Sequence, residues 1–139
     1  MKNLFLDTDV VIDALADRFP FSANAALLFE YAEQGKARLY LSALSYSNIY
    51  YIIRKSNSHK QLLNMLEDLQ SITETLDVTK AVITAAIKSD FGDFEDAIQY
   101  FTAFSQRKMN AIVTRNVKDF KRSELAVLTP EEAVHFIEQ

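Results

Sequence analysis

The sequence predicts an α/β fold, a three-layer sandwich in which a parallel β-sheet of about five strands is flanked by helices. Two observations predict it. Short apolar runs of strand length alternate with longer stretches of helical periodicity from one end of the chain to the other. Strands separated by helices form βαβ units, whose strands are parallel and whose helices cover both faces of the sheet. No repeat, low-complexity tract or linker interrupts the pattern, so we expect a single domain over residues 1–139.

Five apolar runs have strand length, and seven other segments have helical length and spacing. In chain order, the expected strands are Asn3–Asp7, Arg38–Ser42, Glu74–Val78, Ala111–Thr114 and Leu125–Leu128. The expected helices are Val10–Asp17, Ser22–Gly35, Leu44–Ser56, Lys60–Ser71, Thr79–Lys88, Asp93–Lys108 and Pro130–Glu138. Gly35 stands where a helix should end and Pro130 where one should begin, which supports both boundaries.

The composition of the 139 residues, 49% hydrophobic and 24% charged, is typical of a globular protein. No apolar stretch approaches the roughly 20 residues that span a bilayer, and the first residues lack a signal-peptide pattern. Cysteine is absent, which excludes disulfides and thiolate chemistry and agrees with a cytoplasmic location. The net charge of −4 argues against a nucleic-acid-binding module with a basic face, but it is compatible with an enzyme whose acidic site binds cations.

Polar side chains follow three of the expected strands. In open parallel sheets, ligands bind beyond the carboxyl ends of the strands. The residues found there are Asp7, Thr8 and Asp9 after the first strand, Ser42, Ser45 and Asn48 after the second, and Thr114, Arg115, Asn116 and Asp119 after the fourth. We expect Asp9 to cap the helix that follows it, which leaves Asp7 free to point from the strand end into a site.

A second acidic cluster lies in "SDFGDFEDAIQYFTAF", where Asp90, Asp93, Glu95 and Asp96 precede an apolar helix. Asp93 and Asp96 are three residues apart and therefore share one helical face. Asp93 has two interpretations, as the cap of this helix and as a carboxylate of a site. Asp96 is followed directly by apolar residues, which favours a place in the site.

Carboxylates that converge in one cleft repel one another and resist burial unless a cation is present. Hard oxygen ligands without His or Cys suit Mg²⁺ or Mn²⁺. A divalent ion would therefore explain why Asp7 stands at the mouth of a buried strand.

Four segments together resemble the PIN-domain ribonucleases, a family that includes VapC-type toxins. They are "LDTDVVIDAL", "LSALSYSNIYYIIRK", "DFEDAIQYFTA" and "IVTRNVKDF", which occur in this order and cover nearly the whole chain. The resemblance implies a PIN-like parallel sheet with flanking helices and Mg²⁺- or Mn²⁺-dependent hydrolysis of RNA phosphodiester bonds. It also implies a homodimer and, for a toxin, a small antitoxin protein as partner.

By this resemblance, Asp7 matches the first acid of the family, Asp96 the third, and Thr114 a polar residue near the metal. Asn48 and Asn116 stand where the family usually has acids, so two negative charges are missing. The expected catalytic and metal-binding acids are Asp7, Asp93 and Asp96. The expected supporting polar residues are Thr8, Asn48, Thr114, Asn116 and Asp119. The expected RNA-binding cations are Arg54, Lys55, Arg115 and Lys118, with Lys121 and Arg122 as further candidates.

Two alternatives remain open. "DTDVV" and "GDFED" also fit the acidic motifs of haloacid-dehalogenase-type phosphatases, in which Asp7 would attack phosphate and Asp9 would act as acid and base. In that class the late motif follows a strand, whereas "VITAAIKSDF" has a helical pattern. The second alternative, suggested by Asn48 and Asn116, is a PIN-like module that binds RNA or protein without cutting.

Overall fold

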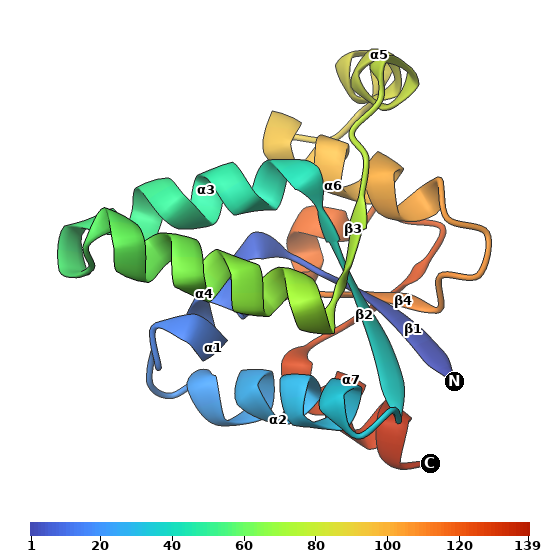
Figure 1. The fold of residues 1–139 in the computed structure, drawn as a ribbon. Helices are drawn as coiled ribbons and strands as arrows, with labels where there is room; N and C mark the ends of the chain where they lie inside the picture. The colour runs from blue at the N-terminus through green and yellow to red at the C-terminus, as the bar shows by residue number, and fades with distance from the viewer.

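The computed structural model describes residues 1–139 and contains one parallel sheet of five strands with helices packed on both faces (Figure 1). The strands are β1 (Lys2–Leu6), β2 (Ala37–Ser42), β3 (Glu74–Leu76), β4 (Ala111–Val113) and β5 (Ala126–Leu128). They lie in the order β3-β2-β1-β4-β5, and every neighbouring pair is parallel. The predicted fold class and all five predicted strands are confirmed.

Seven α-helices and two 3-10 helices connect the strands. They are α1 (Thr8–Leu15), α2 (Ser22–Glu33), α3 (Ala43–Ile53), η1 (Arg54–Ser56), α4 (His59–Ile72), α5 (Lys80–Lys88), α6 (Phe94–Phe104), η2 (Val117–Phe120) and α7 (Pro130–Glu138). All seven predicted helices are present, but α1 begins at Thr8 instead of Val10, and α6 ends at Phe104 instead of Lys108. No helix combines the length and the apolar character needed to cross a membrane.

Local capping explains several helix boundaries. Ser58 and Thr129 start α4 and α7, because each hydroxyl accepts a hydrogen bond from the backbone N–H three residues later. Pro130 occupies the first position of α7, where its fixed φ is already helical. After α2, Gly35 adopts a left-handed φ of 76°, which turns the chain out of the helix.

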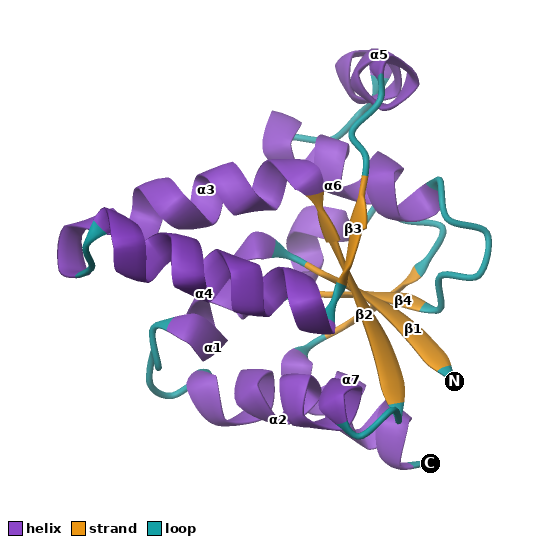
Figure 2. Ribbon diagram, in the orientation of Figure 1, coloured by secondary structure: helices purple, strands orange, loops and turns teal.

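Alternate side chains of the strands point into two different cores. Leu4 and Leu6 of β1 pack against α1, α2, α3, α4 and α7, whereas Phe5 between them faces Tyr100 of α6 on the opposite side. A smaller apolar cluster joins α5 to α6. Figure 2 shows the resulting layers, with the strands in orange between helices in purple. Because all five strands are parallel, their carboxyl ends meet at one edge of the sheet.

Candidate active site

The carboxyl ends of β1 and β4 bring Asp7 and Thr114 together. The two strands are neighbours, so the residues that follow them meet although 107 positions separate them in the chain. The Thr114 hydroxyl accepts a hydrogen bond from the Asn116 N–H at 3.1 Å and donates one to Asp7 Oδ2 at 2.9 Å. Asp7 is only 8% exposed. Its carboxylate is therefore held in one orientation at the strand end.

A buried network of polar side chains next to Asp7 joins three helices. Thr8 Oγ1 accepts a hydrogen bond from Gln99 Nε2 of α6 at 2.8 Å and lies 2.9 Å from Ser45 Oγ of α3, within hydrogen-bonding distance. Ser45 is positioned by Ser42, whose hydroxyl oxygen accepts a hydrogen bond from the Ser45 N–H at the start of α3. The network fixes the starts of α1 and α3 against α6, and these elements carry the predicted site residues Thr8, Asn48 and Asp96.

The prediction that Asp9 caps the first helix is wrong. β1 ends one residue earlier than predicted, so α1 begins at Thr8 and Asp7 itself occupies the cap position without a capping hydrogen bond from its side chain. Asp9 lies in the first turn of α1, where it complements the helix dipole. Its half-exposed carboxylate lies 3.5 Å from Arg18 Nη2 and 4.0 Å from Arg115 Nη2.

A second carboxylate of α1 anchors the loop after β4. Asp13 is fully buried, and its Oδ1 accepts a hydrogen bond from Arg18 Nε at 2.9 Å. Its Oδ2 lies 2.9 Å from Arg115 Nε, an ion pair whose angle is not that of a hydrogen bond. The Arg115 guanidinium also lies 4.2 Å from the centre of the Phe21 ring. Because Arg115 directly follows Thr114, Asp13 holds the loop in which Thr114 stands.

The remaining acids gather at the start of α6. Asp93 is the cap of this helix, and its Oδ1 accepts a hydrogen bond from the Asp96 N–H at 2.9 Å. This confirms the capping interpretation of Asp93, while its role as a metal ligand stays a prediction. Asp93, Asp96 and Asp119 line a hollow of about 350 Å³, hereafter the acidic hollow, and Lys118 lies in the same wall as Asp119.

Two carboxyl groups of the site have raised pKa values. Burial raises the pKa of Asp7 to about 6. Burial also raises the pKa of Asp96 to about 7, and the negative charges of Asp93, Asp7 and Asp119 add to this effect. A carboxylate whose pKa is raised by neighbouring carboxylates is stabilised in its charged form by a cation bound beside them. The arrangement is therefore unfavourable for the empty site and favourable for a site that binds positive charge.

The donor atoms at this edge fit a hard divalent cation. No three His, Cys, Asp or Glu side chains are grouped closely enough to enclose a metal by themselves. Mg²⁺, however, is commonly held by one or two carboxylates, with water and substrate phosphates as further ligands. Asp7 and Asp96 supply two carboxylates. Asn48, one turn beyond Ser45 on α3, has a buried Nδ2 without an acceptor, which a water or a phosphate oxygen would provide.

The four predicted RNA-binding cations do not lie together. Lys118 lines the acidic hollow. Arg115 is turned toward the carboxylate of Asp13. Arg54 and Lys55 form η1, beyond an α3 of 11 residues whose length is roughly 16 Å. Of these four, Lys118 alone lines the acidic hollow, and the RNA contacts of the others stay predictions.

Two polar residues next to the site, Asp13 and Gln99, were missed in the sequence, and a third, Glu95, was noted there without a role. Asp13 and Gln99 stand inside apolar helical stretches, and both are buried. A polar residue at a core-facing position is a signal that could have identified them, since such groups are buried only with partners. Glu95 is exposed on α6, and partial burial together with the carboxylates of Asp93 and Asp9 raises its pKa.

Residues 3–118 match the sequence model of a protein family described as "PIN domain". Ribonuclease VapC1 of Aquifex aeolicus is 25% identical to this chain over 136 residues, which cover 94% of this chain and 92% of that protein.

Several solved structures share the fold. FitAcB from Neisseria gonorrhoeae has a TM-score of 0.67 at 18% identity and covers 92% of this chain and 98% of its own. DNA-bound VapBC from Salmonella typhimurium has a TM-score of 0.66 at 20% identity, with 92% and 97% covered. VapBC2 from Rickettsia felis, bound to a promoter DNA fragment, has a TM-score of 0.62 at 19% identity, with 91% and 96% covered. At these identities the similarity establishes the fold.

Proposed function

The chain belongs to the PIN-domain family, and we propose that it is a ribonuclease that hydrolyses RNA phosphodiester bonds with Mg²⁺ or Mn²⁺. One observation carries the proposal: the Thr114 hydroxyl holds the buried Asp7 carboxylate at the end of β1, where its charge also acts on Asp96, far away in the sequence. Two such carboxylates destabilise the folded protein unless a cation lies between them. The activity named in its relative, Ribonuclease VapC1, supports the same conclusion.

Each residue of the site has a distinct task in this proposal. A bound Mg²⁺ or Mn²⁺ would supply positive charge to the phosphate and lower the pKa of the attacking water. Asp7 and Asp96 would hold the ion, and the Thr114 hydroxyl keeps the Asp7 carboxylate in place. The amides of Asn48 and Asn116 would donate hydrogen bonds to phosphate oxygens or water.

The acidic hollow also suits a nucleic-acid backbone. Lys118, Lys121 and Arg122 line it together with Asp93 and Asp96. A phosphodiester strand would place one phosphate at the acids and their cation, and a neighbouring phosphate against the lysines and arginine. We therefore assign the contacts to flanking phosphates first to Lys118, Lys121 and Arg122.

The alternatives differ in measurable ways. The haloacid-dehalogenase-type phosphatase is not supported, because the residues before Gly92 form helix α5 instead of a strand and Asp9 is paired with two arginines.

The proposed function is tested by incubating the protein with a broad panel of RNAs and Mn²⁺. Cleavage that chelation and Asp7→Asn both abolish would support it. RNA that is bound but stays intact would indicate a non-cleaving PIN-like module.

The substitution Asp93→Asn separates the role of Asp93 as a helix cap from its proposed role in metal binding. Without metal, Asp93→Asn should leave the melting temperature unchanged, because Asn caps a helix nearly as well as Asp. If Asp93 supplies the charge missing at Asn48, the same substitution should weaken Mn²⁺ binding and slow RNA cleavage more than tenfold. Calorimetric Mn²⁺ titration and RNA turnover measure both, with Asp96→Asn as the inactive reference. Wild-type affinity and rate in Asp93→Asn would leave Asp93 as a helix cap alone.

We also propose that the protein is the toxin of a toxin–antitoxin pair and forms a homodimer. The VapBC structures with the same fold support the toxin–antitoxin part of this proposal. A mostly apolar groove of about 460 Å³ between α1, α2 and α4, lined in part by Leu15, Met65 and Leu69, is available to an apolar segment of an antitoxin. Expression from the native locus should yield a dimer that co-purifies with a small protein. A monomer that is harmless when overexpressed alone would contradict both statements.

A further inference from the structure

Three hollows beside the site are joined end to end. The first is the acidic hollow at the start of α6. The second, of about 330 Å³, lies on the loop after β4 and shares Lys118 and Asp119 with the first. The third, of about 300 Å³, lies between that loop and the start of α2 and shares Arg115 with the second. The three neighbouring hollows, hereafter the strand track, line the surface from the acids to Phe21.

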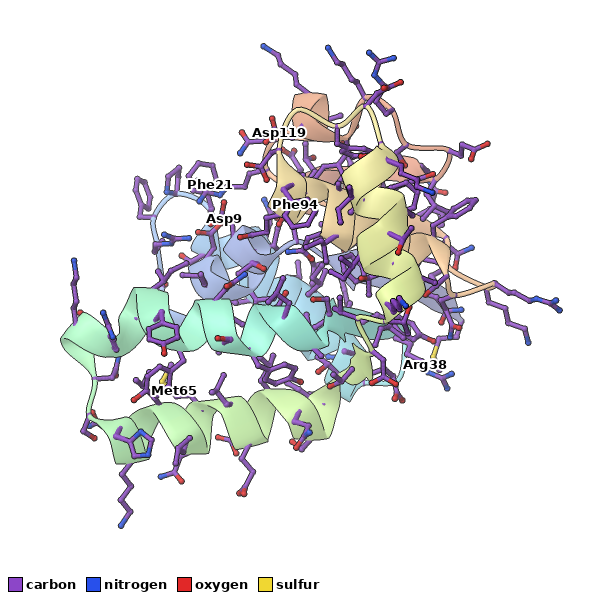
Figure 3. The ribbon with its side chains drawn as sticks, turned by 90° about the horizontal axis from the view of Figure 1, so that it is seen from above. Asp9, Phe21, Arg38, Met65, Phe94 and Asp119 are labelled. Carbon is purple, nitrogen blue, oxygen red and sulfur yellow. The ribbon has the colours of Figure 1, made fainter.

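Phe21 is an exposed aromatic ring at the far end of the strand track. It is 40% exposed and lines the third hollow together with Arg115, whose guanidinium packs against the ring. Figure 3 shows Phe21 on the same side of the molecule as Asp9 and Asp119, away from Met65. The ring belongs to none of the apolar cores. The exposed surface of the Phe21 ring is therefore available to contact a substrate that is bound at the acids.

We propose that Phe21, backed by Arg115, stacks against an unpaired base of an RNA strand that lies in the strand track, next to the cleaved position. The proposal rests on the ribonuclease function and adds to it a residue that binds a base of the substrate. Aromatic rings and arginine planes stack on bases that are unpaired, and bases inside a duplex are not accessible to them.

The charges along the strand track agree with this substrate. The first two hollows contain the cations Lys118, Lys121 and Arg122, which suit successive phosphates. The third hollow contains Arg115, which Asp13 already pairs, and an acid, Glu131. Net positive charge is thus lacking beside Phe21, so a nucleotide there has to be bound mainly through its base.

The test uses Phe21→Leu, Phe21→Tyr and the matched control Phe19→Leu. Phe19 lies in the same loop and is 92% exposed, but it lines none of the three hollows. On a single-stranded RNA that the wild type cleaves, Phe21→Leu should raise KM at least about fivefold, and Phe21→Tyr should restore it, because a Tyr ring also stacks. Phe19→Leu should leave KM unchanged. Equal KM values for Phe21→Leu and Phe19→Leu would overturn the proposal.

A series of RNAs, each lacking one base, separates stacking from an indirect effect through Arg115. At one position, loss of the base should raise the wild-type KM as much as Phe21→Leu does, and Phe21→Leu should add nothing further. An equal loss for every RNA of the series would assign Phe21 to positioning Arg115 and overturn stacking. Unchanged RNA kinetics with loss of a co-purifying protein would assign the ring to a protein interface, which also overturns it.

Failure of the ribonuclease proposal can be recognised separately. If the wild type cleaves no RNA, fluorescence anisotropy with the same labelled single strand in Mn²⁺ replaces kinetics. Weaker binding by Phe21→Leu than by Phe19→Leu would then support the strand track in a non-cleaving protein. Equal binding by the two variants would overturn it.

Discussion

Replacing Asp7 with Asn is expected to abolish Mn²⁺-dependent RNA cleavage while the metal-free protein stays folded. The Asn side chain has nearly the same shape, and its oxygen can still accept the hydrogen bond from the Thr114 hydroxyl. The Asn side chain lacks the negative charge with which we expect the Asp7 carboxylate to bind the metal. Because loss of a residue that only supports a metal ligand already costs 10- to 100-fold, we expect a loss of more than about 100-fold for a direct ligand. RNA turnover and circular dichroism measure the two effects.

Asp77→Asn is the matched control for this substitution. Asp77 is an exposed carboxylate that follows β3 at the same edge of the sheet and lines none of the hollows next to the site. It should therefore keep wild-type activity. Cleavage near the wild-type rate in Asp7→Asn would remove Asp7 from the site, and loss of folding would give it a structural role instead.

The same variant should change how stability depends on pH. Burial raises the pKa of Asp7 from 3.8 to about 6, so the folded protein binds this proton more tightly than the unfolded chain does. The contribution of the Asp7 carboxyl group to the stability of the metal-free wild type is therefore fully present below pH 4 and is lost as the pH rises through 6. Asn resembles the protonated acid and avoids this loss. Thermal melts without metal should show Asp7→Asn gaining on the wild type between pH 4 and 7, by up to about 3 kcal/mol.

Replacing Asp13 with Ala is expected to destabilise the protein by about 3 kcal/mol or more. The fully buried carboxylate is paired with Arg18 and Arg115, both at 2.9 Å. Breaking a buried pair by removing one partner commonly costs 3–5 kcal/mol, because the charge left behind loses its compensation. Here the two arginines are partly exposed and can turn toward water, which favours the lower end of this range. Urea unfolding measures the effect.

Asp9→Ala provides the matched comparison. Asp9 approaches the same two arginines at 3.5 and 4.0 Å, but its carboxylate is 45% exposed. An ion pair of this kind contributes about 0–1 kcal/mol, so this variant should remain close to the wild type. Equal destabilisation by the two substitutions would contradict the prediction that burial and the shorter distances make the ion pairs of Asp13 stronger than those of Asp9.

The sequence by itself determined the architecture and the first acid of the site. Apolar periodicity depends on neighbouring residues, so it placed all five strands and all seven helices. Parallel strands end at one edge of a sheet, which led from the pattern of β1 and β4 to Asp7 and Thr114. The helix that starts beside Asp93 and Asp96 was predicted for the same local reason.

The partners of each charged side chain were decided only by the tertiary structure. Asp9 was expected to cap a helix and instead faces Arg18 and Arg115, while Arg115 was expected to bind RNA and is paired with Asp13. These contacts join α1 to a loop about a hundred residues later in the chain, as the hydrogen bond from Gln99 to Thr8 does across 91 positions. The sequence shows that a residue is polar, and local spacing shows which other residues lie on the same helical face. Its partner depends on how distant elements pack, and the packing also decides which carboxylates are buried, which raise one another's pKa and which remain open to a substrate.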